Sequence, residues 1–202
     1  MNQEQFWAGQ FGTDYINRNN HEVLLSSNIH FFSNIVSKMP KLPSSVIELG
    51  ANVGMNIRAL KELLPGASFT GVEINQTACT HLAALGCAVH NASIQEIELR
   101  ENFDLVLCKG VLIHLNPDSL NMVYQKIYNL TNEWILFAEY YNPTPIAIDY
   151  RGHSDKLFKR DFAGEILYKY KDLELVATGF AYHLDQFPQD DITWFLLRKK
   201  TE

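Results

Sequence analysis

Glycine and glutamate residues stand at the ends of two consecutive apolar segments of this sequence. The first segment leads into VIELGANVG (46–54), which holds Glu48, Gly50 and Gly54, and the next one ends at Glu73. A glycine turn between a strand and a helix lets a ligand approach the backbone closely, and the helix start offers free N–H groups. A carboxylate at the second strand end can accept hydrogen bonds from both hydroxyls of a ribose. These residues predict a site for a cofactor that contains a nucleoside.

The spacing of the glycines separates two kinds of cofactor. Dinucleotides favour G-x-G-x-x-G, whose middle glycine makes room for a pyrophosphate. Asn52 and Met55 occupy the second and third glycine positions here, so the dinucleotide pattern fails twice. S-adenosylmethionine has no phosphate, tolerates a looser loop, and carries an amino-acid end that suits an acidic residue such as Glu48. The sequence therefore predicts S-adenosylmethionine rather than NAD, although the glycine pair taken alone is also compatible with a simple tight turn.

Further cofactor contacts are expected at the carboxyl ends of the strands, where open α/β sheets bind their ligands. Ser93 is the polar residue nearest the expected adenine end, and it is equally suited to capping a short helix. The backbone around Lys109 and Gly110 is expected to line the methionine part. The complete set of predicted cofactor contacts is Tyr15, Glu48, Gly50, Ala51, Asn52, Gly54, Glu73, Ile74, Ala92, Ser93, Ile94, Lys109, Gly110 and Val111.

Methyl transfer to a hydroxyl needs a group that removes its proton. His114 follows the fourth apolar segment, where donor and acceptor should meet, and a histidine pKa suits neutral pH. Its alternative role is structural, orienting the loop. The other candidate bases are His153, Glu139 and Asp161. No metal-ligand spacing stands out, so the reaction is predicted to be metal-independent.

Aromatic and basic side chains cluster after the fifth apolar segment. Arginine side chains match the geometry of carboxylate and phosphate groups, so this segment is suited to an anionic small molecule. The alternative is a solvated basic face. The predicted acceptor-binding residues are Tyr140, Tyr141, Asn142, Arg151, Lys159 and Arg160, with His153 nearby.

Short apolar segments that alternate with helical patterns must position these residues. Such alternation predicts a parallel sheet covered by helices on both faces, and a final antiparallel pair indicates a doubly wound, seven-stranded, mostly parallel α/β sheet. Strands are expected at 44–50, 67–75, 87–92, 103–110, 133–141, 173–183 and 191–199, and helices at 55–64, 76–86, 117–130 and 159–170.

The N-terminal segment reads as a helical cap over residues 1–40, followed by a single globular domain over 41–202. Its aromatic residues Phe6, Trp7, Phe11 and Tyr15 are expected either to cover the cofactor as a lid or simply to pack on the domain.

Composition excludes several classes of protein. The chain has 202 residues, 47% hydrophobic and 20% charged residues, and a net charge of −6, which is typical of a globular domain without a broad nucleic-acid-binding face. No apolar run is long enough to span a membrane, and no secretory signal is apparent. Three cysteines without metal-ligand spacing fit a reducing cytoplasm.

The glycine loop, Glu73 and FDLVLCKGVLIHLNP (103–117) together resemble the class I methyltransferase family over roughly residues 40–200. More narrowly, residues 4–9, 11–19, 139–145, 150–153 and 157–165 resemble the methylases associated with pseudaminic-acid biosynthesis. The resemblance implies a Rossmann-like methyltransferase domain. It also implies S-adenosylmethionine-dependent transfer to a nonulosonic-acid-related or nucleotide-activated sugar in surface-polysaccharide metabolism. An NAD-dependent sugar oxidoreductase or epimerase, and a non-catalytic S-adenosylmethionine-binding protein, remain the alternatives.

Overall fold

The central sheet has seven strands in the order β3-β2-β1-β4-β5-β9-β8. The computed structural model describes residues 3–16, 22–150 and 152–200, and for residues 153–155 the backbone alone. The first five strands of the sheet are parallel, whereas β9 is antiparallel to both β5 and β8. This confirms the predicted doubly wound, mostly parallel sheet. The strands are β1 (Ser45–Leu49), β2 (Ser68–Glu73), β3 (Ala88–Asn91), β4 (Phe103–Lys109), β5 (Thr131–Glu139), β8 (Leu173–Ala181) and β9 (Ile192–Lys199).

Alternating side chains of the strands build two separate cores, one on each face of the sheet. In β4, Leu107 packs with Phe32 on one face, while Val106 and Cys108 pack with Ile127 on the other. Both faces are therefore apolar, as expected for a parallel sheet between helical layers. One face carries α3 (Glu22–Val36), α4 (Met55–Leu63) and α5 (Gln76–Ala83), and the other carries α6 (Leu120–Leu130) and α7 (Phe162–Lys169).

A two-stranded hairpin, β6 (Ile146–Tyr150) with β7 (His153–Lys159), stands apart from the main sheet. The sequence analysis assigned no strand to this segment and expected a helix from residue 159, whereas α7 begins at Phe162. The missed strand β6 is short and mostly exposed, so it lacks the buried apolar pattern that marks the other strands. The hairpin contacts the turn η1 (Leu112–His114) that follows β4.

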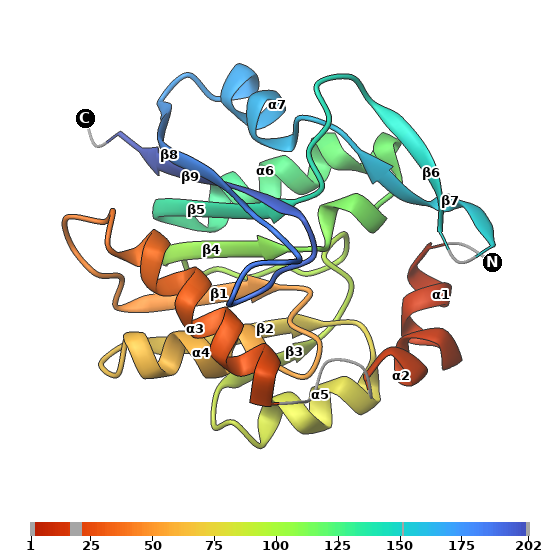
Figure 1. The fold of residues 1–202 in the computed structure, drawn as a ribbon, viewed down its shortest axis with the longest axis horizontal. Coiled ribbons are helices and arrows are strands. Elements are labelled where there is room, and N and C mark those ends of the chain that lie inside the picture. The colour runs from red at the N-terminus through yellow and green to blue at the C-terminus, as the bar shows by residue number, and fades with distance from the viewer. Residues whose placement is uncertain (1–2, 17–21, 151, 201–202) are drawn as a thin grey trace.

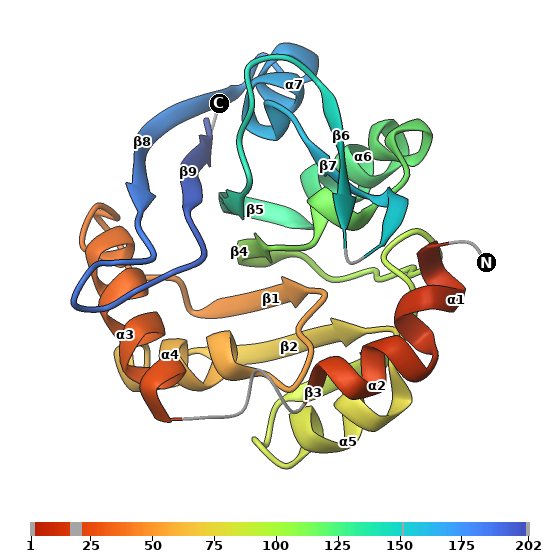
Figure 2. The same ribbon diagram turned by 45° about the vertical axis from the view of Figure 1, so that its right-hand side comes forward.

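Two short helices, α1 (Gln3–Ala8) and α2 (Gln10–Ile16), lie beside the carboxyl ends of β1 and β2 (Figures 1 and 2). By contrast, Phe32 and Ile35 of α3 belong to the core beneath the sheet. The N-terminal segment is helical, as predicted, but α3 is an integral part of the domain. The boundary between residues 40 and 41 stays a prediction. Among the described residues, no helix has the length and apolarity needed to cross a membrane.

Candidate active site

A cavity of about 270 Å³ opens where the parallel strands end. Its walls come from the segments that follow β1 to β5, from the N-terminal helices and from the β8–β9 connection. Most of the predicted cofactor contacts lie together here, although they are spread over nearly a hundred positions of the chain. Those that line the cavity are Tyr15, Gly50, Ala51, Asn52, Glu73, Ile74, Ala92, Ser93, Ile94, Lys109, Gly110 and Val111.

Backbone conformation makes the turn after β1 possible. Gly50 has φ +78°, and a Cβ added there would stand 2.5 Å from a methyl carbon of Val111. Asn52, in place of a glycine, also has a positive φ of 48°, a conformation that asparagine tolerates better than most residues. Gly54 begins α4 with φ 81° but does not line the cavity. Gly54 thus starts the helix, and its predicted contact with the cofactor stays a prediction.

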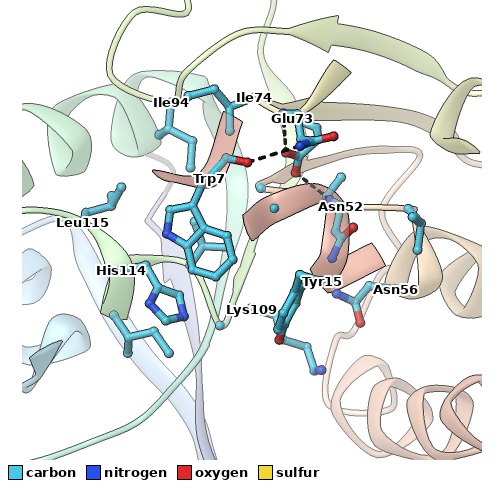
Figure 3. Close-up of a pocket in the computed structure, with 18 of the residues that line it drawn as sticks. Trp7, Tyr15, Asn52, Asn56, Glu73, Ile74, Ile94, Lys109, His114 and Leu115 are labelled. Carbon is cyan, nitrogen blue, oxygen red and sulfur yellow. Dashed lines mark hydrogen bonds between the residues drawn. The ribbon is translucent and has the colours of Figure 1, made fainter. Parts of the chain in front are cut away.

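Glu73 is held in place by two backbone N–H groups, one from the turn after β1 and one from the residues after β2. Its Oε2 accepts a hydrogen bond from the Asn52 N–H at 2.8 Å, and its Oε1 accepts one from the Asn75 N–H at 2.7 Å (Figure 3). Burial raises the pKa of Glu73, while these backbone donors oppose the rise. Each carboxylate oxygen can accept more than one hydrogen bond. Glu73 thus retains acceptor capacity for the two hydroxyls of a ribose.

Ser93 lies in the cavity wall at the start of a turn over residues 94–96, where a short helix was expected, and its contact with the adenine stays a prediction. Ser93 lines the cavity beside Ile74 and Ile94, and its hydroxyl also accepts a hydrogen bond from the Gln95 N–H. The same hydroxyl donates to the carboxylate of Glu4 on α1. Glu4 was not predicted from the sequence, because its proximity depends on a contact between residues 89 positions apart. An acidic group therefore reaches this end of the cavity from the N-terminal helix.

Asn75 fastens the N-terminal helices to the sheet. Its Oδ1 caps α5, and its Nδ2 donates towards the carbonyl oxygens of Trp7 and Gly9 at 3.3 and 3.4 Å and to the Thr13 hydroxyl at 3.2 Å. The indole of Trp7 consequently lies in the cavity between Ile94, His114 and Tyr15 (Figure 3). The expected aromatic cover over the site is present. Whether it opens and closes as a lid stays a prediction.

A buried chain of amides lies under the other end of the cavity. Gln189 Nε2 donates to Asn28 Oδ1 at 3.0 Å, Asn28 Nδ2 to Asn56 Oδ1 at 3.0 Å, and Asn56 Nδ2 to Glu48 Oε1 at 2.6 Å. We name Glu48, Asn56, Asn28 and Gln189 the amide chain. Asn28, Asn56 and Gln189 line the cavity, whereas Glu48 lies behind Asn56, and its predicted contact with the cofactor stays a prediction. Burial raises the pKa of Glu48 to about 8.

His114 presents one ring nitrogen to the backbone and lines the cavity with the rest of its ring. Its Nδ1 lies 2.7 Å from the Lys156 carbonyl oxygen, which only a protonated Nδ1 can bind. Burial lowers the pKa of His114 to about 4, against the opposing effect of this bond. The ring is therefore neutral near pH 7, with an unprotonated Nε2. Trp7 and Tyr150 flank it at 4.6 and 5.1 Å between ring centroids.

Two of the other candidate bases are structural. The buried Glu139 carboxylate accepts hydrogen bonds from the backbone N–H groups of Val111, Leu112 and Ile113 at 3.0–3.4 Å, so it holds the turn after β4. Burial raises the pKa of Glu139 to about 7. Asp161 accepts a hydrogen bond from Gly164 N–H and caps α7. Neither lines the cavity. The side chain of His153 is outside the described part of the chain.

The basic cluster is only partly brought to the cavity. Lys159 does not itself line the cavity, but its Nζ stands 5.0 Å from the ring centroid of Tyr140, which does. Arg160 instead pairs with Glu165 through Nε at 2.6 Å, which removes it from the predicted acceptor site. Tyr141 packs near Phe195, and Asn142 donates to a carbonyl within its own loop, so neither lines the cavity.

Arg151 lies outside the described residues. In the ranges that the structure does describe, no three histidine, cysteine or acidic side chains gather as they would around a metal ion. Metal independence stays a prediction.

Comparisons with known proteins agree with this geometry. Residues 47–133 match the family described as "Methyltransferase domain". A search of curated proteins found no match. Among solved structures, the plantazolicin methyltransferase BpumL in complex with SAH has a TM-score of 0.69 at 15% identity, covering 98% of this chain and 94% of that one.

Two further solved structures have similar statistics. The magnesium protoporphyrin IX methyltransferase ChlM from Synechocystis PCC 6803, with bound SAM, has a TM-score of 0.68 at 14% identity, covering 99% of this chain and 98% of that one. The Burkholderia thailandensis 1,6-didemethyltoxoflavin-N1-methyltransferase has a TM-score of 0.71 at 14% identity, covering 98% and 87%. The likeness shows that this chain has the fold of these methyltransferases, and the domain match over residues 47–133 agrees with the predicted enzyme class.

Proposed function

We propose that this S-adenosylmethionine-dependent methyltransferase acts on a small anionic acceptor, a nonulosonic-acid-related or nucleotide-activated sugar of surface-polysaccharide metabolism. The observation that carries the methyltransferase function is Glu73, held at the end of β2 in a cavity bordered by the turn after β1. The resemblance to pseudaminic-acid methylases supports a sugar of this kind as the methyl acceptor. Three free cysteines favour a cytoplasmic reaction.

The chain's own residues mainly bind and orient the reactants. The cofactor supplies an activated methyl group, so catalysis rests on holding the acceptor atom in line with it. Glu73 is suited to the ribose, and the slot between Ile74 and Ile94 is suited to an apolar ring face. The indole of Trp7 covers the cavity and reduces the access of water to it.

His114 is the best-placed base for a hydroxyl acceptor. Nδ1–H is committed to the Lys156 carbonyl, so Nε2 is the atom that can accept a proton. Because the β6–β7 hairpin supplies that carbonyl, the hairpin acts as a positioning element for the imidazole.

Replacing His114 with asparagine is expected to lower kcat about a hundredfold, the usual scale of general-base catalysis. Asparagine can still donate to the Lys156 carbonyl but offers no nitrogen base. The measurement is steady-state methyl transfer, with calorimetry of S-adenosylhomocysteine as the control for cofactor binding. Because the pKa of His114 is about 4, wild-type kcat should show no inflection from this residue between pH 5 and 8. A kcat within threefold of wild type would leave His114 with the structural role only.

Lys159 is the side chain that can bind the negatively charged group of the acceptor. Replacing Lys159 with glutamine is expected to raise KM for a nonulosonic acid about tenfold, since one charge-assisted hydrogen bond is worth about 1.5–3 kcal/mol. KM for a neutral sugar of the same size should not change. Lys171→Gln is a matched control, because Lys171 also lies over a tyrosine, Tyr168 at 4.3 Å, but is away from the cavity. Equal effects on charged and neutral sugars would remove the argument for an anionic acceptor.

A further inference from the structure

The side chain of Lys109 brings a positive charge into the cavity, and no carboxylate of the described residues forms a close ion pair with it. Lys109 ends β4 and points into the cavity below Tyr15 (Figure 3). Lys109 makes no ion pair or hydrogen bond with any residue in the described ranges, and its Nζ lies 5.8 Å from the ring centroid of Phe31. The sequence analysis assigned only its backbone to the cofactor. The ammonium group is therefore available to a ligand.

An ammonium group in this position favours a nearby anion. Burial lowers the pKa of Lys109, and the more distant carboxylates of Asp190, Glu48 and Glu139 oppose that effect. Taking a charge out of water without a close partner is costly, and a ligand anion would compensate much of that cost. Asn28, Gln189 and Asp190 also line the cavity, so its wall holds amide groups and a carboxylate besides the ammonium group.

The order of the strands places Lys109 at a useful distance from Glu73. β1 lies between β2 and β4, so the two residues end strands that are two places apart in the sheet. Neighbouring strands are about 4.8 Å apart, which separates the two strand ends by about 10 Å. A cofactor whose ribose lies at Glu73 and whose tail crosses the turn after β1 would extend towards Lys109. Its amino-acid end carries a carboxylate.

We propose that Lys109 is the receptor for a ligand carboxylate, and that this carboxylate belongs to the amino-acid end of S-adenosylmethionine. The inference rests on the proposed function, because it assumes that the ribose binds at Glu73. A carboxylate on the acceptor is the second possible source of the same chemistry. In either case a neutral side chain at position 109 should discriminate against ligands with a carboxylate and not against those without one.

The test compares two nucleosides that differ in the amino-acid end. Calorimetry measures binding of S-adenosylhomocysteine and of 5′-methylthioadenosine, which lacks the whole amino-acid group, to wild type, Lys109→Met and Lys109→Gln. Both variants should bind S-adenosylhomocysteine at least tenfold more weakly and 5′-methylthioadenosine as wild type does. Lys126→Met is the matched control, because Lys126 is bonded to the Ile97 carbonyl outside this cavity. Thermal unfolding checks that all three variants fold.

The remaining outcomes each decide against the proposal in a distinct way. One outcome is unchanged binding of S-adenosylhomocysteine with a raised KM for N-acetylneuraminic acid but not for N-acetylmannosamine. This would show that Lys109 binds the carboxylate of the acceptor, and it would overturn the assignment to the cofactor. Equal weakening of both nucleosides would mean that Lys109 only shapes the cavity. Unchanged binding of every ligand would show that Lys109 takes no part in the site. Failure of the proposed function itself would appear differently, as wild-type protein that binds neither nucleoside.

Discussion

Replacing Glu73 with alanine is expected to weaken binding of S-adenosylhomocysteine by at least tenfold. The carboxylate can accept hydrogen bonds from both ribose hydroxyls, and each charge-assisted bond is worth about 1.5–3 kcal/mol, where 1.4 kcal/mol is a tenfold change. The effect on 2′,3′-dideoxy forms of the same ligand should be much smaller. Calorimetry on the purified protein measures both, and Glu73→Gln provides a variant of closer shape.

The fold should survive the loss of Glu73. The backbone N–H groups of Asn52 and Asn75 lose their acceptor, but they border a cavity that water can enter. Glu62→Ala serves as the control, because Glu62 is an exposed residue of α4. An unchanged dissociation constant in Glu73→Ala would show that the ribose lies elsewhere. Binding of NAD at comparable strength to wild type would contradict the assignment of the cofactor.

Replacing Gly12 with alanine is expected to detach the N-terminal helices from the cavity and to weaken S-adenosylhomocysteine binding by at least tenfold, about 1.4 kcal/mol. A Cβ at this position would stand 1.9 Å from the Trp7 carbonyl oxygen and 3.1 Å from Asn75 Nδ2. Because the closest obstacle is backbone, the corner between α1 and α2 must move. That movement would displace the Trp7 indole from the cavity wall.

Two readouts make this prediction specific. Tryptophan fluorescence should report a more polar environment, while thermal unfolding should change little, since the two main cores contain no residue of α1 or α2. Gly66→Ala is the control, because nothing lies within 4 Å of a Cβ added at Gly66. Wild-type affinity together with wild-type fluorescence in Gly12→Ala would show that the corner tolerates the methyl group. The N-terminal helices would then not be needed in their present place.

The parts of the fold that follow from local patterns were predictable. β1, β2 and β4 have nearly continuous burial, so their apolar runs identified them, and the residues that follow each run fell at the cavity. The β6–β7 hairpin was missed because its strand β6 is mostly exposed and pairs only with β7. Boundaries of the other elements differ from the predictions by a few residues at most, the usual uncertainty of helix and strand ends.

The side-chain partners of the candidate site residues were not predictable from residue types. The neutralisation of Arg160 by Glu165 cannot be read from a cluster of basic residues, since both partners are ordinary surface residue types. Likewise, nothing local indicates that Glu139 binds the backbone of residues 111–113 rather than a substrate. The carboxylates at strand ends were thus found correctly as a group, but their separate roles depend on which backbone donors the fold places beside them.

The amide chain has a consequence for how this protein can change over evolutionary time. Each side chain of the amide chain is hydrogen-bonded to one from a different part of the fold. A single substitution therefore leaves the donor or acceptor of the adjacent side chain without its partner. Such a loss costs about 1–3 kcal/mol, whereas exchanging both partners for apolar groups of the same shape can be nearly neutral. Selection on these positions should therefore be epistatic. Among homologues, Asn28, Asn56 and Gln189 are expected to covary as a set instead of drifting one at a time.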